Sequence, residues 1–227
     1  MNHQASLNKL KTPLAGAVVW LCLASNHALA QTPQWWITRG VLNQNPAQDY
    51  TPVNQGQLKW LASNAYAEVS RTIGPDTGLT ARINAFSTTN NYFPVNIGQV
   101  KHLAAPFYDR LYAFGLTNSL PAGIQGHYPW DGKPETNDFA MVNIGQAKYV
   151  FSFDLSVDSD HDSLPDWWEI ANFGGTNNCA PDDDPDGDGY TNLEEYQAGT
   201  VPTNPDTDPP AVSIQTPVNG TRVVWVP

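Results

Sequence analysis

Twelve residues in the C-terminal half of the chain place oxygen-bearing side chains at a regular spacing. Counting Asp184 as position one, carboxylates stand at positions one, three, five and twelve, and an amide stands at position nine. Gly189, at position six, permits the sharp turn with positive φ that such a loop needs. Calcium is a hard cation that takes six to eight oxygen ligands. The spacing therefore predicts a calcium-binding loop in which the backbone carbonyl of position seven also serves, with the ligands Asp184, Asp186, Asp188, Tyr190, Asn192 and Glu195.

A second loop of the same spacing begins 26 residues earlier, at Asp158. Positions one, three, five, nine and twelve are all acidic, and position seven again offers a carbonyl, so the predicted ligands are Asp158, Asp160, Asp162, Leu164, Asp166 and Glu169. Ser163 stands where the other loop has glycine, and serine adopts positive φ at a cost of roughly 1 kcal/mol. We expect this first loop to be the weaker or more strained site. The alternative is an acidic linker whose spacing arose by chance.

The first thirty residues have the features of a secretory signal peptide. Lys9 and Lys11 precede an apolar run, residues 14–23, and Ala28-Leu29-Ala30 forms a small-x-small cleavage signal. We expect residues 1–30 to be removed after Ala30 and the protein to be secreted or held at the cell surface. The apolar run is too short to span a membrane, and no transmembrane segment is expected. Cys179 is then the single remaining cysteine, and we interpret it as an incidental loop residue rather than a reactive thiol.

Charge is unevenly distributed along the chain. The formal net charge is −11 and the pI is about 4.6, so nucleic acid is a poor partner. Of the 22 acidic residues, 15 lie between Asp154 and Asp208, whereas Lys and Arg do not occur between Lys148 and Arg222. This shift predicts a domain boundary near residue 155, between a first region at 31–155 and a calcium-binding segment at 156–200.

The first region contains an internal repeat of the form Asn-x-Gly-Gln-x-Lys, with copies at Asn54, Asn96 and Asn143. Asn is a good helix N-cap, and Gln three residues later can bond back to the cap. Apolar residues follow at helical spacing, so each copy predicts a helix, the third short at roughly 144–152. Pro106 should kink or restart the second helix. Each helical unit must bury one face against its neighbour, which predicts stacked repeats.

Two features of the repeats have more than one interpretation. The aromatic residues could be core side chains, which we favour, or stacking platforms for a sugar polymer; they are Trp60, Tyr66, Tyr108, Tyr112 and Trp130. Lysines recur at one helical position and could pair with acidic groups of the next unit; they are Lys59, Lys101 and Lys148. Nothing near these lysines indicates a catalytic role.

The chain after residue 200 changes character. Residues 201–210 are rich in Pro, Thr and Asp and predict a linker. Asn204-Pro-Asp206-Thr-Asp208 begins like a third calcium loop, but Pro209-Pro210 occupies the place of the glycine turn, so we do not count it as a site. Residues 211–227 alternate around Asn219-Gly220 and predict a β-hairpin.

Several of these patterns resemble known families. The segment from Asp158 to Asp208 resembles calcium-binding repeats of the EF-hand and thrombospondin type 3 kind in large secreted bacterial proteins. The resemblance implies two ligand sets: Asp158, Asp160, Asp162, Asp166 and Glu169, and Asp184, Asp186, Asp188, Asn192 and Glu195. The Asn-x-Gly-Gln-x-Lys repeats resemble N-terminal regions that accompany such repeats. Residues 208–226 resemble the first strands of a bacterial immunoglobulin-like domain, so we expect the chain to be a fragment, with residues 211–227 a partial strand pair.

The expected fold is mainly α: short helical repeats followed by tandem EF-hand-like calcium loops and a C-terminal β-hairpin fragment. The expected function is that of a non-catalytic, calcium-ion-binding module of an exported or cell-surface protein, in which calcium makes the segment rigid. The alternative is a carbohydrate-binding or adhesive surface protein whose partner is a polysaccharide or another protein. An enzyme is not expected, because no histidine lies in a recognisable nucleophile or zinc motif; those considered are His102, His127 and His161.

Overall fold

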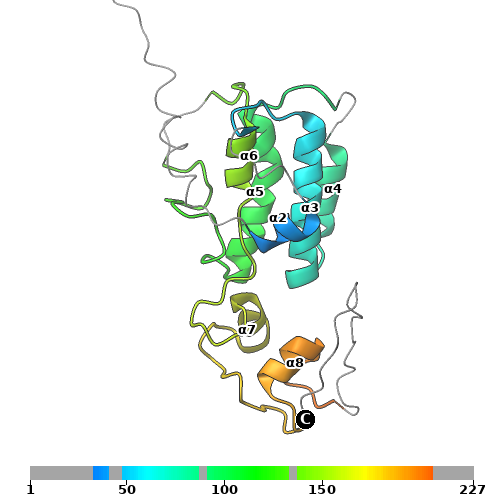
Figure 1. Ribbon diagram of the computed structural model, residues 1–227, viewed down its shortest axis with the longest axis vertical. Coiled ribbons are helices and arrows are strands. Elements are labelled where there is room, and N and C mark those ends of the chain that lie inside the picture. The colour runs from blue at the N-terminus through cyan, green and yellow to red at the C-terminus, as the bar shows by residue number, and fades with distance from the viewer. Residues whose placement is uncertain (1–32, 41–47, 87–90, 133–136, 207–227) are drawn as a thin grey trace, which may run out of the picture. The chain divides into compact units, whose positions relative to one another are not determined.

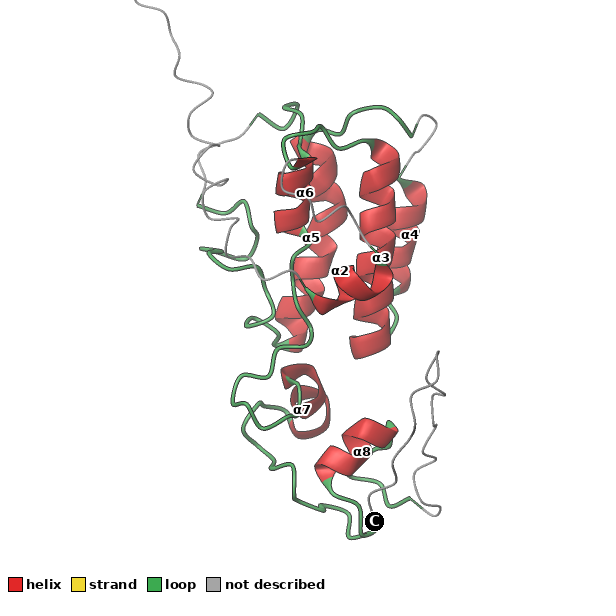
Figure 2. Ribbon diagram, viewed as in Figure 1, coloured by secondary structure: helices red, strands yellow, loops and turns green. Residues whose placement is uncertain are grey.

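A computed structural model describes residues 33–40, 48–86, 91–132 and 137–206 (Figure 1). The chain divides into two compact units between Asp154 and Leu155, where the sequence places its change of charge. The described residues are mainly helical, and Figure 2 draws no strand among them. The predicted signal peptide and β-hairpin lie outside the described residues. No helix in the described ranges is both long enough and apolar enough to cross a membrane.

The first unit is a group of helices (Figure 1). In chain order they are α2 (Gln34–Arg39), α3 (Gln55–Ile73), α4 (Thr77–Ala85), α5 (Ile97–Phe114) and α6 (Ile144–Val150). Helices α3, α4 and α5 pack against one another. Helix α5 continues through Pro106, so the predicted restart at that residue is wrong. Helix α6 ends two residues before the predicted position.

The three repeated motifs begin α3, α5 and α6, as predicted. Each cap Asn accepts a hydrogen bond from the backbone N–H of the Gln three residues on, at 2.8 or 2.9 Å. Each Gln side chain in turn accepts from the backbone N–H of the Asn, at 2.9 or 3.0 Å. Two of the N–H groups at each helix start are thereby satisfied, and a cap of this kind contributes about 1 kcal/mol.

A closed ring of backbone hydrogen bonds joins the three repeats. The N–H of Val95 donates to the carbonyl of Val53 at 3.0 Å, that of Val142 to Val95 at 2.9 Å, and that of Val53 to Val142 at 2.9 Å. All three side chains are buried. Each repeat therefore contacts both others, and the units form a threefold ring rather than the predicted stack, in which each unit contacts only its sequence neighbours.

The recurring lysines follow the same threefold pattern. Lys101 Nζ lies 2.7 Å from Asp138 Oδ1 of the next repeat, as predicted. Lys148 Nζ lies 2.6 Å from Asp49 Oδ1 of the first repeat, which is its next neighbour only because the ring is closed. Lys59 instead donates to the carbonyl of Phe86 at 3.5 Å. Its expected carboxylate is missing because the equivalent position is Asn91.

Helix α4 was not predicted from the sequence. Asp76 caps it by accepting from the N–H of Leu79 at 2.8 Å, and the other carboxylate oxygen lies 2.9 Å from Arg110 Nη1 on α5. The available signal was an acidic N-cap followed by apolar residues four apart, Leu79 and Ile83, both of which are buried.

The N-terminal tryptophans close the end of the third repeat. Trp35 and Trp36 are buried, and their Nε1–H groups donate to the carbonyls of Phe153 at 3.0 Å and Phe151 at 3.2 Å. Among the aromatic residues considered as sugar platforms, Tyr108 is fully buried, whereas Trp60 is 56% exposed. The favoured core interpretation is therefore right for Tyr108 and wrong for Trp60.

The second unit contains α7 (Asp166–Phe173) and α8 (Asn192–Ala198), each preceded by one of the acidic loops. Glycines in left-handed conformation end both helices: Gly174 has φ of 76° and Gly199 has φ of 79°. The rings of Trp168 on α7 and Tyr196 on α8 are in contact, with their centroids 5.9 Å apart. The two helices thus share an aromatic contact within a unit rich in acidic residues.

Candidate metal site

The second loop is held in shape by its own carboxylates. Asp184 accepts backbone hydrogen bonds from Gly187 at 2.9 Å and from Gly189 at 3.0 Å, one on each oxygen. Asp188 Oδ1 accepts from the N–H of Tyr190 at 2.9 Å. Each acceptor bonds to a residue two to five positions ahead, so the loop curls around its acidic side chains.

The first loop repeats these hydrogen bonds at equivalent positions. Asp158 accepts from His161 at 2.7 Å and from Ser163 at 2.9 Å, again one on each oxygen. Asp162 Oδ1 accepts from the N–H of Leu164 at 2.8 Å. The replacement of glycine by Ser163 therefore leaves these three hydrogen bonds in place.

The first loop does pay more conformational free energy for its backbone, because two of its residues with a Cβ have positive φ. His161 and Ser163 have φ of 66° and 85°, the left-handed region, which residues with a Cβ avoid. The equivalent residues of the second loop, Gly187 and Gly189, have φ of 77° and 97°. The two loops share a conformation, and the first one adopts it with two unfavourable residues.

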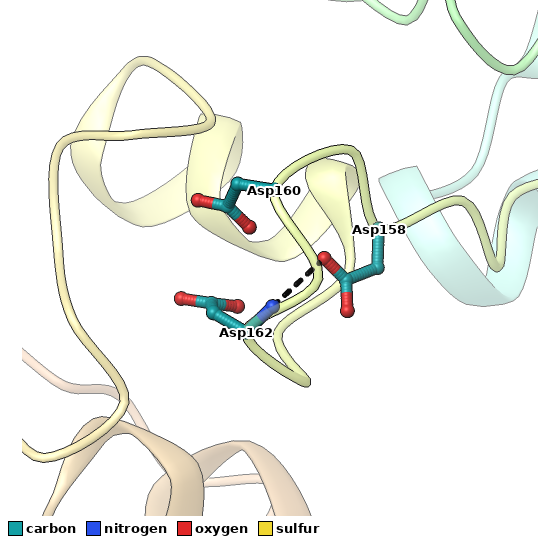
Figure 3. A group of neighbouring side chains, drawn as sticks. All are labelled: Asp158, Asp160 and Asp162. Atoms are coloured by element: carbon teal, nitrogen blue, oxygen red, sulfur yellow. Dashed lines mark hydrogen bonds between the residues drawn. The ribbon is translucent and has the colours of Figure 1, made fainter.

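The predicted aspartates gather within each loop. Carboxylate oxygens of Asp158, Asp160 and Asp162 lie within 4.8 Å of one another, and Figure 3 shows the three side chains around one turn of the chain. Burial, and then the neighbouring charge of Asp162, raises the pKa of Asp160. In Asp158 the N–H donors outweigh burial and lower the pKa. Asp184, Asp186 and Asp188 form the equivalent group in the second loop.

The glutamate at position twelve of each loop is fully buried. Glu169 and Glu195 both have 0% exposure. Both oxygens of Glu195 lack a hydrogen-bond partner among the described residues, and so does Oε2 of Glu169. Burial, and then the aspartates of the same loop, raises the pKa of each to about 7. A buried carboxylate without a donor is costly unless a cation accompanies it.

The predicted ligands at positions nine and seven are not part of the carboxylate groups described above. Asp166 is buried, and both of its oxygens accept from Ser159, at 2.8 Å from the N–H and 2.7 Å from the hydroxyl. Asn192 is buried, donates to the carbonyl of Ala180 at 2.7 Å, and leaves its Oδ1 without a partner in the described ranges. Leu164 and Tyr190, predicted to ligate through their carbonyls, lie at equivalent turns of the two loops.

Asp206 lies close to the second loop, which the sequence did not predict. Carboxylate oxygens of Asp188, Glu195 and Asp206 lie within 4.8 Å of one another. A glycine turn after Asp208 would be needed for a separate third loop, but not for a single residue that returns to the preceding loop. The signal was present as an acidic residue shortly after a helix of the site.

Cys179 is half-buried beside the first loop, with its Sγ 3.7 Å from Glu169 Oε1. Burial, and then the charge of Glu169, raises the pKa of the thiol to about 12. Such a thiol is protonated at neutral pH and a poor nucleophile, which argues against the alternative of a reactive thiol.

Comparisons of the sequence with protein families and with curated proteins, and of the fold with solved structures, found no match.

Proposed function

We propose that residues 156–200 form a calcium-binding segment with one ion in each acidic loop, and that this segment is part of an exported protein without catalytic activity. The observation that carries the proposal is Glu195, a fully buried carboxylate with no donor to either oxygen among the described residues. It lies beside two further carboxylates of the cluster, those of Asp188 and Asp206. A cation at this position would offset both the burial and the mutual repulsion of these groups.

The chemistry of the donors favours calcium over other metals. The gathered side chains are all carboxylates, and zinc prefers nitrogen and sulfur ligands in a tetrahedral set. Magnesium demands near-ideal octahedral geometry and keeps several waters, whereas calcium accepts six to eight oxygens in a flexible arrangement. The first ion would be held by Asp158, Asp160, Asp162 and Glu169, and the second by Asp184, Asp186, Asp188 and Glu195.

Export fits this function because calcium is available outside cells at the concentrations that such modules need. Extracellular calcium modules have dissociation constants of about 10⁻⁴ to 10⁻³ M. An ion that binds only the folded segment stabilises it by mass action, by about 2.7 kcal/mol at one hundred times the dissociation constant. Calcium would thus provide the rigidity that disulfides provide in other small exported domains.

Calorimetry with calcium tests the proposal directly. We expect saturable binding of two ions, and at least tenfold weaker binding of one of them after Glu195→Gln. Asp182→Asn, which removes an exposed carboxylate near the second loop, is the matched control and should change the affinity little. Absence of saturable heat up to several millimolar calcium, or unchanged protease resistance of the C-terminal unit after chelation, would refute the proposal.

A second candidate function, binding of a surface polysaccharide or protein, is favoured by exposed aromatic residues of the ring. Tyr50, Tyr92 and Phe139 occupy equivalent positions before the three caps and are 71%, 86% and 85% exposed. Tyrosine is enriched at binding interfaces because its ring combines an apolar body with a polar tip, so these positions are candidates for a contact. Co-sedimentation with insoluble cell-wall polysaccharide tests this candidate, and sedimentation that persists after all three residues are changed to Ala would exclude these aromatics as the contact.

A further inference from the structure

Asp206 lies outside both twelve-residue loops yet reaches the second one. It follows Glu195 by eleven residues, and a carboxylate oxygen of each lies within 4.8 Å of the other and of one from Asp188. The backbone N–H of Asp206 also donates to Asp188 Oδ2 at 2.8 Å. The chain beyond α8 therefore returns to the loop that precedes α8.

Hydrogen bonding does not account for the presence of a carboxylate at position 206. Its Oδ2 is buried and has no partner among the described residues, and the same is true of Asp186 Oδ2 and of both oxygens of Glu195. The bond from the Asp206 N–H to Asp188 accounts for the return of the chain, but any residue except proline could make it. A neutral side chain at this position would make the same bond without repulsion from Glu195.

We propose that Asp206 is a ligand of the second calcium ion, so that the ion fastens the segment 199–206 to the loop at 184–195. This inference rests on the proposed function, because it assumes that the second loop binds calcium. Asp206 adds a fourth aspartate carboxylate to those of Asp184, Asp186 and Asp188 and the carboxylate of Glu195. Affinity in calcium loops rises with the number of charged ligands, so the second site gains from this residue.

Calcium bound to Asp206 would restrain the backbone of residues 199–206. Few hydrogen bonds hold it: the N–H of Thr200 donates to the carbonyl of Glu195 at 3.0 Å, and that of Asn204 donates to Val201 at 3.0 Å. A metal bond to Asp206 would close the segment at its far end. Amide exchange between residues 200 and 206 should then depend on calcium and on the Asp206 side chain.

The test uses the full chain with the first site silenced by Glu169→Gln, so that calorimetry reports the second site alone. In this background Asp206→Asn keeps the backbone donor and removes the carboxylate charge. We expect calcium to bind about tenfold more weakly, the equivalent of 1.4 kcal/mol. The matched control Asp182→Asn removes the same charge from an exposed position and should change affinity by less than twofold.

Hydrogen exchange provides the second readout. In the Glu169→Gln parent, calcium should slow exchange in both α8 and residues 200–206; after Asp206→Asn, only the slowing in α8 should remain. Equal loss of affinity in the Asp206 and Asp182 variants, or unchanged protection of residues 200–206, would overturn the proposal while leaving calcium binding intact. If the parent itself binds no calcium, the proposed function fails and this inference fails with it.

Discussion

The substitution Ser163→Gly should stabilise the ordered conformation of the first loop. The size of this stabilisation can be worked out from the backbone conformation. Ser163 has φ of 85°, and the equivalent Gly189 has φ of 97° within the same pattern of hydrogen bonds. A left-handed conformation costs a residue with a Cβ about 1–2 kcal/mol relative to glycine. Glycine makes the unfolded chain more flexible, which returns about 0.4–1 kcal/mol of that gain. The net stabilisation is about 0.8 kcal/mol.

This stabilisation converts into affinity if the loop is mostly disordered without calcium and calcium binds only the ordered form. A change of 1.4 kcal/mol is tenfold, so about 0.8 kcal/mol corresponds to roughly fourfold tighter calcium binding at the first site. The reciprocal change, Gly189→Ser, should weaken the second site by a similar factor. A Cβ built at Gly189 meets no atom within 4 Å, so the reciprocal variant isolates the backbone cost from any clash.

Calorimetry measures both effects when the other site is silenced. Ser163→Gly is measured in a Glu195→Gln background, and Gly189→Ser is measured in a Glu169→Gln background. Opposite changes of similar size are expected in the two loops. The reasoning is refuted if Ser163→Gly leaves the affinity unchanged or lowers it while Gly189→Ser weakens its own site, because the backbone cost would then differ between loops that share a conformation.

Two further predictions concern the first unit. Asn91→Asp should give Lys59 the carboxylate that the other two lysines have, and should raise the free energy of unfolding, measured by urea titration, by about 0.5 kcal/mol. Asp138→Asn removes the partner of Lys101 and should lower the free energy of unfolding by a similar amount. An Asp138→Asn variant that is more stable than the parent would contradict the threefold equivalence. Asp76→Asn keeps the cap acceptor but loses the charge 2.9 Å from Arg110, and should cost up to about 1 kcal/mol at pH 7. The N–H at the start of α4 lowers the pKa of Asp76 against an opposing effect of burial, and Arg110 lowers it further. The stability from this carboxylate is therefore present above its ordinary pKa of 3.8 and lost as pH falls through the lower folded value, so the variant and the parent should converge once the pH is below that folded pKa. A difference that persists in acid would show that the charge is not responsible.

The sequence predicted the features that depend on neighbouring residues. The Asn-x-Gly-Gln motif places both partners of a capping box within four positions, so the starts of α3, α5 and α6 could be read directly. The acidic groups of the two loops were predicted for the same reason, because each lies within five consecutive positions.

Features that depend on distant residues could not be predicted in this way. The ring at Val53, Val95 and Val142 is made by backbone groups, which carry no side-chain signature in the sequence. The approach of Asp206 to Glu195 depends on the path of the chain after α8. Helix α4 was missed because its one turn of apolar spacing is short and follows Gly74-Pro75, which favours a loop.

The ring of valines sets the number of copies that this architecture can hold. In an open solenoid a further unit can be added at either end, since each end presents an unused face. Here the N–H of each valine is already bonded to the carbonyl of another, so none of the three is left to receive a fourth copy. Duplication of one 42- to 47-residue unit would have to break a bond of the ring before it could be accommodated, and natural variation in this region is therefore expected to change the loops between helices rather than the count of units.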